Sequence, residues 1–233
     1  MLVLAYVGIL AAPMLRRPAR LSVGASRYAH RMQLEVEPPF VLVKPVDDED
    51  AYYALDEDSP WQLLDGRLVA RPASHRHEEL FRFLLMLFGG WLDERGGGVV
   101  LGSRYPMRLD PRWSPEPDLL VVTDEHRHRI TSQRLEGPAD LVVEIASDGD
   151  PEFDERERLP RYRAAGIPEI WLVSPQTRSV RLDLLDTGGA YRTDRRGDGP
   201  IFSAVLPGFW IDAGWLFQES LPSALACLRR VLA

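Results

Sequence analysis

A helical period of apolar positions runs through one long segment of the chain. The positions are Leu80, Phe83, Leu84, Leu87, Phe88 and Trp91. Their spacing of three and four residues is typical of an amphipathic helix that buries one face. Ser74 precedes the segment as an amino-terminal cap, and the glycines from Gly96 onward end it. We therefore expect a buried helix between Ser74 and these glycines.

Shorter apolar runs without that period predict strands along the rest of the chain. The runs lie at 99–102, 105–109, 118–122, 140–147, 169–175 and 179–185, and a last apolar segment spans 201–217. Asp65-Gly66 separates two further short runs and favours a tight turn, so we expect a hairpin over about 61–70. Helices are expected around 155–165 and at the C-terminus, and a short polar helix or loop around 124–136. This order predicts an α/β fold, with a mixed β-sheet core flanked by helices and an N-terminal β-hairpin.

The composition along the chain divides it into four segments. Residues 1–34 begin with an apolar stretch that is too short to span a bilayer, and its arginines follow rather than precede it, unlike those of a secretory signal. We expect these residues to be a leader, either poorly ordered or upstream of the true translation start. Residues 35–56 are expected to form an extended acidic lead-in. A main domain over 57–220 and a C-terminal helix over 221–233 complete the expected organisation.

Composition also narrows the partners and the compartment. The 233 residues carry a net charge of −7, and the first 34 contain five arginines and no acid, so the remainder is more acidic still. An acidic domain binds nucleic acid poorly unless metal ions neutralise its carboxylates or arginines gather on one face. Cys227 is the single cysteine, which indicates a reducing compartment, and we expect a cytoplasmic protein without a membrane partner. Lys44 is the single lysine, so a mechanism that needs a catalytic lysine has one candidate.

Two carboxylates occur within the otherwise apolar runs that predict strands. Asp118 opens the strand that follows Pro117, and Glu144 lies inside a run that otherwise favours burial on both faces. A buried carboxylate is costly unless it is paired or binds a cation. If the two strands are neighbours, Asp118 and Glu144 meet at one edge of the sheet as hard oxygen ligands, which suit Mg²⁺ or Mn²⁺. The plainer interpretation is that each residue only starts or finishes a strand.

The segment after Glu144 carries a basic residue and a tyrosine at helical spacing. Arg158 and Tyr162 are four residues apart and therefore share a face of the expected helix. Pro160 is tolerated in a first turn but kinks a helix interior, so the helix either starts near Glu157 or bends there. A surface ion pair with a neighbouring acid is the plainer role for Arg158.

Two His-Arg-His tripeptides, at 75–77 and 126–128, invite comparison with a zinc site. Alternate residues share a face only in a strand, and the first tripeptide is expected to start a helix. No cysteine supports a zinc site there. We therefore do not favour zinc, and we assign His77 first to the polar beginning of the helix.

The motifs together have a familiar order. The segments are LLDGRLV, a helix that opens with His77, PEPDLLVV, GPADLVVEIAS, ERLPRYRAAGIPEIWLVSP and VLPGFWID. This series resembles the Uma-type putative restriction endonuclease family, a bacterial branch of the PD-(D/E)XK nuclease superfamily. The resemblance covers about residues 57–217 and implies a restriction-endonuclease-like fold. Each short motif is weak by itself, and their common order is the specific signal.

The resemblance implies a set of site residues. Asp118 and Glu144 would bind Mg²⁺ or Mn²⁺, with the carbonyl of Ile145 as a further ligand. The family places a lysine four residues before the tyrosine that matches Tyr162, and this chain has Arg158 there. Two further positions depart from the wider pattern, since Ala146 stands where the superfamily has its lysine and Gln62 where the family often has glutamate. His77 matches a histidine at the start of the family's first helix, and a contact to the substrate or to the site carboxylates is its second interpretation.

The arginine decides between two hypotheses about activity. Arginine keeps the positive charge and can clamp a phosphate, but its pKa above about 12 prevents it from accepting a proton. The first hypothesis is a divalent-metal-dependent endonuclease that hydrolyses DNA, with Arg158 as phosphate clamp and Tyr162 supporting it. The second is a weakened or inactive nuclease fold that serves as a nucleic-acid-binding or interaction module. A structural protein is a third, and we do not assign Lys44 the missing role. Cutting both strands of a duplex would favour a homodimer.

Overall fold

The computed structural model describes residues 19–22, 33–36, 42–46, 48–56, 59–70, 74–102, 104–146 and 154–233. Most of the expected leader lies outside these ranges. Within them, β1 (Ala19–Ser22) and β2 (Gln33–Val36) pair antiparallel as a separate two-stranded sheet.

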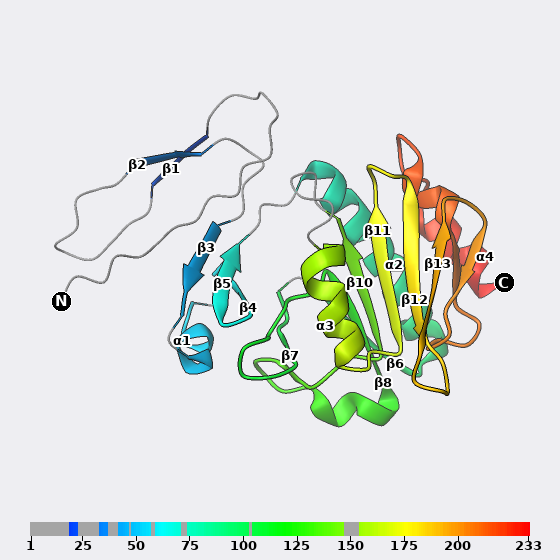
Figure 1. Ribbon diagram of the computed structural model, residues 1–233. Coiled ribbons are helices and arrows are strands. Elements are labelled where there is room, and N and C mark those ends of the chain that lie inside the picture. Colours follow the sequence, from blue (N-terminus) through cyan, green and yellow to red (C-terminus); the bar gives the residue numbers. More distant parts are fainter. Residues whose placement is uncertain are drawn as a thin grey trace, which may run out of the picture.

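A six-stranded mixed sheet forms the centre of the described part of the chain (Figure 1). Its strand order is β13-β12-β11-β10-β8-β6. β10 and β11 are parallel, and the other neighbouring pairs are antiparallel. The strands are β6 (Gly98–Gly102), β8 (Leu119–Thr123), β10 (Leu141–Ile145), β11 (Glu169–Ser174), β12 (Ser179–Leu185) and β13 (Tyr191–Arg196).

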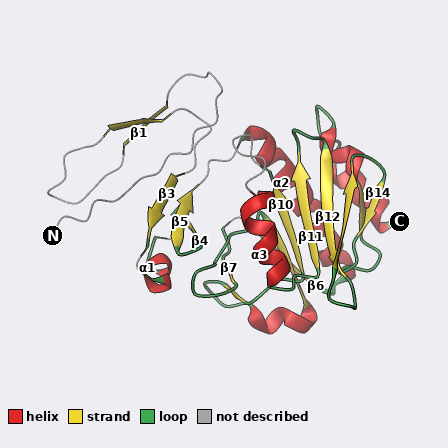
Figure 2. Ribbon diagram, viewed as in Figure 1, coloured by secondary structure: helices red, strands yellow, loops and turns green. Residues whose placement is uncertain are grey.

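Helices cover both faces of this sheet (Figure 2). α2 (His75–Arg95) and α4 (Ala224–Leu232) pack on one face, where they meet Leu141 and Val143 of β10. The other face carries α3 (Leu159–Ala164), which packs against Val142 and the following Ala146. Successive side chains of β10 therefore enter different cores, as the two-residue period of a strand requires. The predicted α/β fold with a mixed sheet flanked by helices is confirmed.

α2 begins and ends where the sequence indicates. The hydroxyl of Ser74 accepts a hydrogen bond from the backbone N–H of His77 at 3.2 Å, and the helix ends before Gly96, whose φ is +72°. The six apolar positions at helical spacing are all buried. At Gly90 the helix passes close to α4, because a Cβ there would lie 2.3 Å from a methyl carbon of Leu228.

A smaller three-stranded sheet lies before α2 in the chain. Its order is β3-β5-β4, built from β3 (Leu42–Pro45), β4 (Gln62–Leu64) and β5 (Arg67–Ala70). The turn between β4 and β5 has positive φ at both Asp65 and Gly66, which confirms the hairpin that this pair predicts. The segment expected to be an extended acidic lead-in contributes β3 and a short helix, α1 (Glu49–Tyr53).

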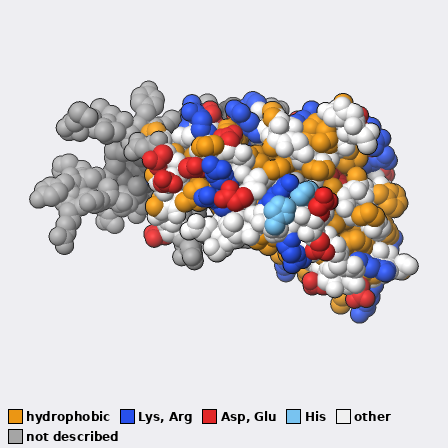
Figure 3. All heavy atoms as spheres, turned by 90° about the horizontal axis from the view of Figure 1, so that it is seen from below, with side chains coloured by type: hydrophobic (Ala, Val, Ile, Leu, Met, Phe, Trp, Pro, Cys, Tyr) orange, Lys and Arg blue, Asp and Glu red, His pale blue; other side chains and the backbone are white. Residues whose placement is uncertain are grey.

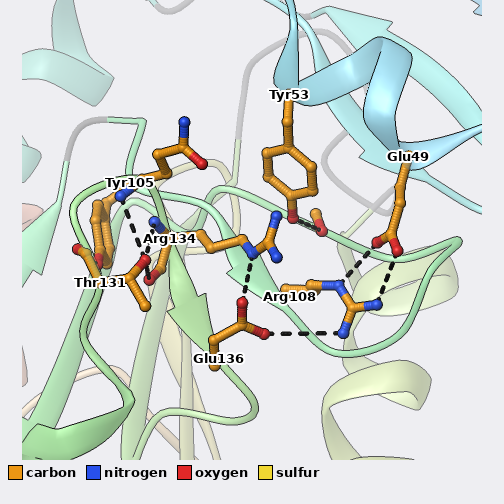
Figure 4. A network of polar contacts seen from close by, with 9 residues as sticks. Glu49, Tyr53, Tyr105, Arg108, Thr131, Arg134 and Glu136 are labelled. Carbon is orange, nitrogen blue, oxygen red and sulfur yellow. Dashed lines mark hydrogen bonds and ion pairs between the residues drawn. The ribbon is translucent and has the colours of Figure 1, made fainter.

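Polar contacts dock α1 onto the rest of the fold (Figure 4). Arg108 donates two hydrogen bonds to the carboxylate of Glu49, at 2.8 and 2.9 Å. The guanidinium of Arg134 lies over the ring of Tyr53 and also donates to Glu136 at 2.7 Å. These residues connect α1 to the loop that carries β7 (Met107–Arg108) and β9 (Leu135–Glu136). α1 is therefore fixed against this loop.

The remaining elements include one strand that no sequence period indicates. The strand β13 reads Tyr-Arg-Thr-Asp-Arg-Arg and forms an edge of the main sheet, where its exposed side chains need no apolar alternation. The expected apolar segment 201–217 contains a hairpin followed by a 3₁₀ turn. These elements are β14 (Pro200–Phe202), β15 (Trp210–Asp212) and η3 (Ala213–Phe217). No helix in the described ranges has the length and apolar character needed to cross a membrane.

Candidate active site

The antiparallel pairing of β8 and β10 brings Asp118 and Glu144 to the same end of the sheet. Asp118 immediately precedes β8, and Glu144 is the next-to-last residue of β10. A side-chain oxygen of Asp118 accepts a hydrogen bond from the backbone N–H of Ile145 at 2.7 Å, which ties the two strands together here. β6 also passes close, because a Cβ at Gly102 would lie 2.7 Å from the carbonyl oxygen of Asp118.

Glu144 is almost completely buried and each of its carboxylate oxygens accepts a hydrogen bond. Arg158 Nη1 donates to Oε2 at 2.5 Å, and the Tyr162 hydroxyl donates to Oε1 at 2.5 Å. The two donors lie one helical turn apart, as their spacing predicts. Since side chains alternate along β10, Glu144 points toward the face covered by α3, where both donors are located.

Arg158 is a buried residue rather than a surface arginine. Its side chain is 6% exposed, and its Nη2 donates to Gln62 Oε1 at 2.7 Å. Its Nε lies 3.5 Å from Oδ1 of Asp154. The residue ends η2 (Asp154–Arg158), a π-helical turn that runs directly into α3, and Pro160 falls within the first turn of α3. Pro160 therefore lies in a first helical turn, where proline is tolerated. This matches the expectation that the helix starts near Glu157 rather than bending at Pro160.

His77 contacts one of the predicted metal ligands. Its Nε2 lies 3.0 Å from Oδ1 of Asp118, and its Nδ1 lies 3.5 Å from the carboxylate of Glu78. Burial alone would lower the pKa of His77, but the two neighbouring carboxylates outweigh burial and raise the pKa. The contact to a site carboxylate is thus present, while the backbone N–H of the same residue is the donor in the helix cap.

Sequence reasoning missed a third carboxylate beside the pair. One oxygen of Glu116 accepts a hydrogen bond from the Tyr52 hydroxyl at 2.7 Å, and its backbone N–H donates to Gln62 Oε1 at 3.2 Å. Burial raises the pKa of Glu116 to about 7, against the opposing effects of Tyr52, Arg104 and Arg158. The available signal was its position two residues before Asp118, because alternate residues of an extended segment share a side.

Burial and neighbouring carboxylates disfavour the charged form of Glu144. Burial raises the pKa of Glu144, Arg158 opposes this effect, and the nearby carboxylates of Asp118 and Asp154 add to the increase. Burial is therefore a larger cause than like-charge crowding between Glu144 and its neighbouring carboxylates. A cation bound beside Asp118 and Glu144 would favour the charged form of Glu144.

The residues present suit a hard divalent cation. Among the described residues, no three His, Cys, Asp or Glu side chains are grouped to hold a metal ion, so Asp118 and Glu144 would act as two carboxylates. Mg²⁺ commonly binds through one or two carboxylates, with water and substrate phosphate completing its shell. Ile145 directly follows Glu144 in β10, and its backbone N–H donates to Asp118; a backbone carbonyl suits the same chemistry.

The other residues considered in the sequence lie elsewhere. Ala146 is buried in the core under α3. Lys44 lies over the ring of Trp61, with Nζ 4.7 Å from the ring centroid. The second His-Arg-His tripeptide belongs to η1 (Asp124–Arg129), and His126 Nδ1 lies 2.6 Å from Oδ1 of Asp140. η1 directly follows β8, whereas Asp118 directly precedes β8, so the two lie at opposite ends of the sheet. Figure 3 shows the molecule from below, with histidines beside acidic and basic side chains.

Comparisons with known proteins bear on the family and the fold. The model of the Uma2 family, described as "Putative restriction endonuclease", matches residues 49–214. Among solved structures, one titled as a putative nuclease belonging to DUF820 from Anabaena variabilis ATCC 29413 is similar in fold, with a TM-score of 0.60 and 14% sequence identity. The match covers 74% of this chain and 98% of that one. No curated protein matches the chain.

Proposed function

Because the chain belongs to the Uma2 family of restriction-endonuclease-like proteins, we propose that it hydrolyses phosphodiester bonds of DNA with the help of Mg²⁺ or Mn²⁺. The observation that carries the proposal is the meeting of Asp118 and Glu144 at one end of β8 and β10. Burial and the carboxylates of Asp118 and Asp154 disfavour the charged form of Glu144, and a bound cation would favour it, which supports a cation there. The nuclease-like fold is common to this chain and the DUF820 structure.

Each residue of the site has a distinct part in this proposal. Asp118, Glu144 and the Ile145 carbonyl would hold the cation, which would polarise a phosphoryl oxygen and lower the pKa of a water molecule. His77 orients Asp118 through the contact at 3.0 Å. Tyr162 and Arg158 orient Glu144, and the positive charge of Arg158 would offset charge that develops on the phosphate.

One observation favours a second candidate, a nuclease fold with weak or no cleavage. Arg158 occupies the position of the family's lysine, and the structure commits it to Glu144 and Gln62 inside the protein. Arginine cannot accept a proton at neutral pH. If the reaction needs a proton acceptor at this position, the protein would bind DNA but cleave it weakly or not at all.

Cleavage of both strands of a DNA duplex would suit two copies of the chain. We therefore also propose that the protein is a homodimer, and that it acts in the cytoplasm.

Thermal unfolding with and without MnCl₂ tests the metal site independently of activity. A cation present at one hundred times its Kd stabilises the folded state by about 2.7 kcal/mol, which corresponds to about 5–10 °C for a chain of this size. We expect this shift in the wild type and its loss in Asp118→Asn and Glu144→Gln. Glu169→Gln is the matched control, since it also replaces a buried carboxylate but lies outside the site. Equal shifts in all four proteins would refute the site.

Cleavage of supercoiled plasmid in MgCl₂ or MnCl₂ then separates the two candidates. Nicking by the wild type that Asp118→Asn abolishes supports the nuclease. Metal binding and DNA binding without nicking support the second candidate.

A further inference from the structure

The face of the main sheet that carries Glu144 continues past α3 onto two outer strands. Direct pairing aligns Glu144 of β10 with Leu172 of β11, Leu172 with Arg181 of β12, and Arg181 with Arg195 of β13. Paired residues point to the same side of a sheet. Arg181 and Arg195 therefore stand on the same face and in the same row as the carboxylate of the candidate active site.

Three arginines on this face share two carboxylates. Arg181 donates to Glu155 at 2.8 Å and to Asp183 at 3.1 Å. Arg195 donates to the same oxygen of Glu155, and Arg163 of α3 donates to Asp183 at 2.7 Å. We call Arg163, Arg181 and Arg195 the arginine cluster. Its local charge is positive, in a chain whose net charge is −7.

The arginine cluster is fixed in place, and Arg195 and Arg163 are its more exposed members, since the Arg181 side chain is only 18% exposed. Asp183 is fully buried and also accepts a hydrogen bond from Thr193. Its ion pairs with Arg163 and Arg181 therefore fix these two arginines on the sheet. The side chain of Arg195 is 50% exposed, and that of Arg163 is 32% exposed. Among the described residues, Glu155 is the only carboxylate paired with the Arg195 guanidinium, which leaves donors of that group facing outward.

We propose that the arginine cluster binds the backbone phosphates of the DNA strand next to the phosphate at Asp118 and Glu144. The inference rests on the proposed function, and it assigns the direction in which the substrate crosses the fold. Because α3 covers β10 and β11 on this face, the strand would pass over α3 and reach β12 and β13 beyond it, roughly perpendicular to the β-strands. Neighbouring strands lie about 4.8 Å apart, so Arg181 and Arg195 lie about 10 and 14 Å from β10 across the sheet.

The chemistry of the cluster suits phosphate. A guanidinium offers two parallel N–H groups to one phosphate, and such contacts position a nucleic acid without reading its sequence. Glu155 prevents the arginines from repelling one another before DNA arrives. Burial works to raise the pKa of Glu155, but Arg181 and Arg195 outweigh burial and lower it, so this carboxylate is charged at neutral pH. It therefore competes with DNA for both arginines.

The first test compares Arg195→Gln with Arg196→Gln. The two arginines are neighbours on β13, are 50% and 52% exposed, and each pairs with one acid. Arg196 pairs in register with Val180, which belongs to the core under α2, so its side chain lies on the opposite face. Binding of a fluorescent 30-base-pair DNA duplex is measured by anisotropy in EDTA from low to high NaCl. The metal-free buffer keeps cleavage out of the measurement.

We expect Arg195→Gln to remove one phosphate contact and Arg196→Gln to remove none. Losing one contact reduces the slope of log K against log salt by about 0.9 and weakens binding about eightfold at 0.1 M salt. Equal slopes and affinities in the wild type and both variants would overturn the proposal. So would the absence of DNA binding by the wild type.

A second variant gives a result that misfolding cannot imitate. Glu155→Gln removes the charge that competes for Arg181 and Arg195, and we expect it to bind the duplex several-fold more tightly, with a steeper salt dependence. Unchanged or weaker binding by a folded Glu155→Gln protein would contradict the proposal.

The outcome for the DNA path is separate from the outcome for catalysis. Dependence of binding on Arg195 without plasmid cleavage would support the path and refute the nuclease. Cleavage with identical DNA binding by Arg195→Gln and the wild type would support the nuclease and refute the path.

Discussion

Replacing Arg158 with lysine separates the charge of this residue from its geometry. In the structure its guanidinium donates to Glu144 at 2.5 Å and to Gln62 at 2.7 Å from two different nitrogens. A lysine at this position can keep the ion pair with Glu144. Its single nitrogen does not reproduce the two separate donors of the guanidinium, so we expect the contact to Gln62 to be lost. The variant also restores the residue type that the family pattern has there.

The two consequences have opposite signs. Losing the hydrogen bond from a charged donor to Gln62 costs about 1–2 kcal/mol of folding free energy, since the Gln62 oxygen keeps the Glu116 N–H as a donor. If the missing proton acceptor limits the reaction, the lysine raises cleavage by about 10²-fold, the lower end of general acid–base contributions. That factor lowers the activation free energy by about 2.7 kcal/mol. We therefore expect a less stable protein that cuts faster.

Metal-dependent nicking of supercoiled plasmid measures the rate, and urea unfolding measures the stability. Arg156→Lys is the matched control, because Arg156 belongs to the same π-helical turn and its side chain is 53% exposed. We expect the control to leave both quantities unchanged. DNA binding should barely differ among the three proteins.

Two results would refute this reasoning about Arg158. Rapid cutting by the wild type that falls in Arg158→Lys would show that arginine is the working residue through its charge or its paired donors. A rate that stays within a few fold would show that no proton acceptor is needed at this position. A loss of stability alone would leave only the structural contact supported.

Two further predictions concern carboxylates outside the site. Glu169→Ala removes the acceptor of four hydrogen bonds, which come from the Trp171 ring, the Ser203 hydroxyl and the backbone N–H groups of Ala204 and Val205. We expect the free energy of unfolding, measured in urea, to fall by about 3 kcal/mol or more. A fall below about 1 kcal/mol would contradict this role. Asp183 is buried, which works to raise its pKa, but hydrogen bonds from Thr193, Arg163 and Arg181 outweigh burial and hold the pKa below its ordinary value of 3.8. A lowered folded-state pKa contributes stability above the unfolded-state value and loses it as the pH falls through the folded-state value, so Asp183→Asn should be less stable than the wild type at pH 7 and the difference should shrink below about pH 4. A difference that is constant from pH 7 to pH 3 would refute this assignment.

Local patterns determined much of this fold from the sequence. The helix from His75, its cap at Ser74 and the turn at Asp65-Gly66 depend on residues within a few positions of one another. The strands of the central sheet are apolar because both of their faces are covered, so their runs are visible without knowledge of their neighbours. The order of these elements and motifs was also sufficient to indicate the nuclease-like family, which the match over residues 49–214 confirms.

The sequence also selected Asp118, Glu144, Arg158 and Tyr162, because a carboxylate in an apolar strand and a pair at helical spacing are local signals. It did not show how they connect. The contact of Gln62 with Arg158 joins residues 96 positions apart, and that of Tyr52 with Glu116 joins residues 64 positions apart. No local period contains either contact.

Only the tertiary structure decided which charges are buried and which face solvent. Arg158 and Arg195 are the same residue type in arginine-rich segments, yet one is buried against Glu144 and the other is half exposed. β13 was missed because an edge strand needs no apolar side chains, and its register with β12 places Arg195 on the face of the candidate site. Burial and register depend on what packs across the chain rather than along it, and these two quantities set the electrostatics of the site.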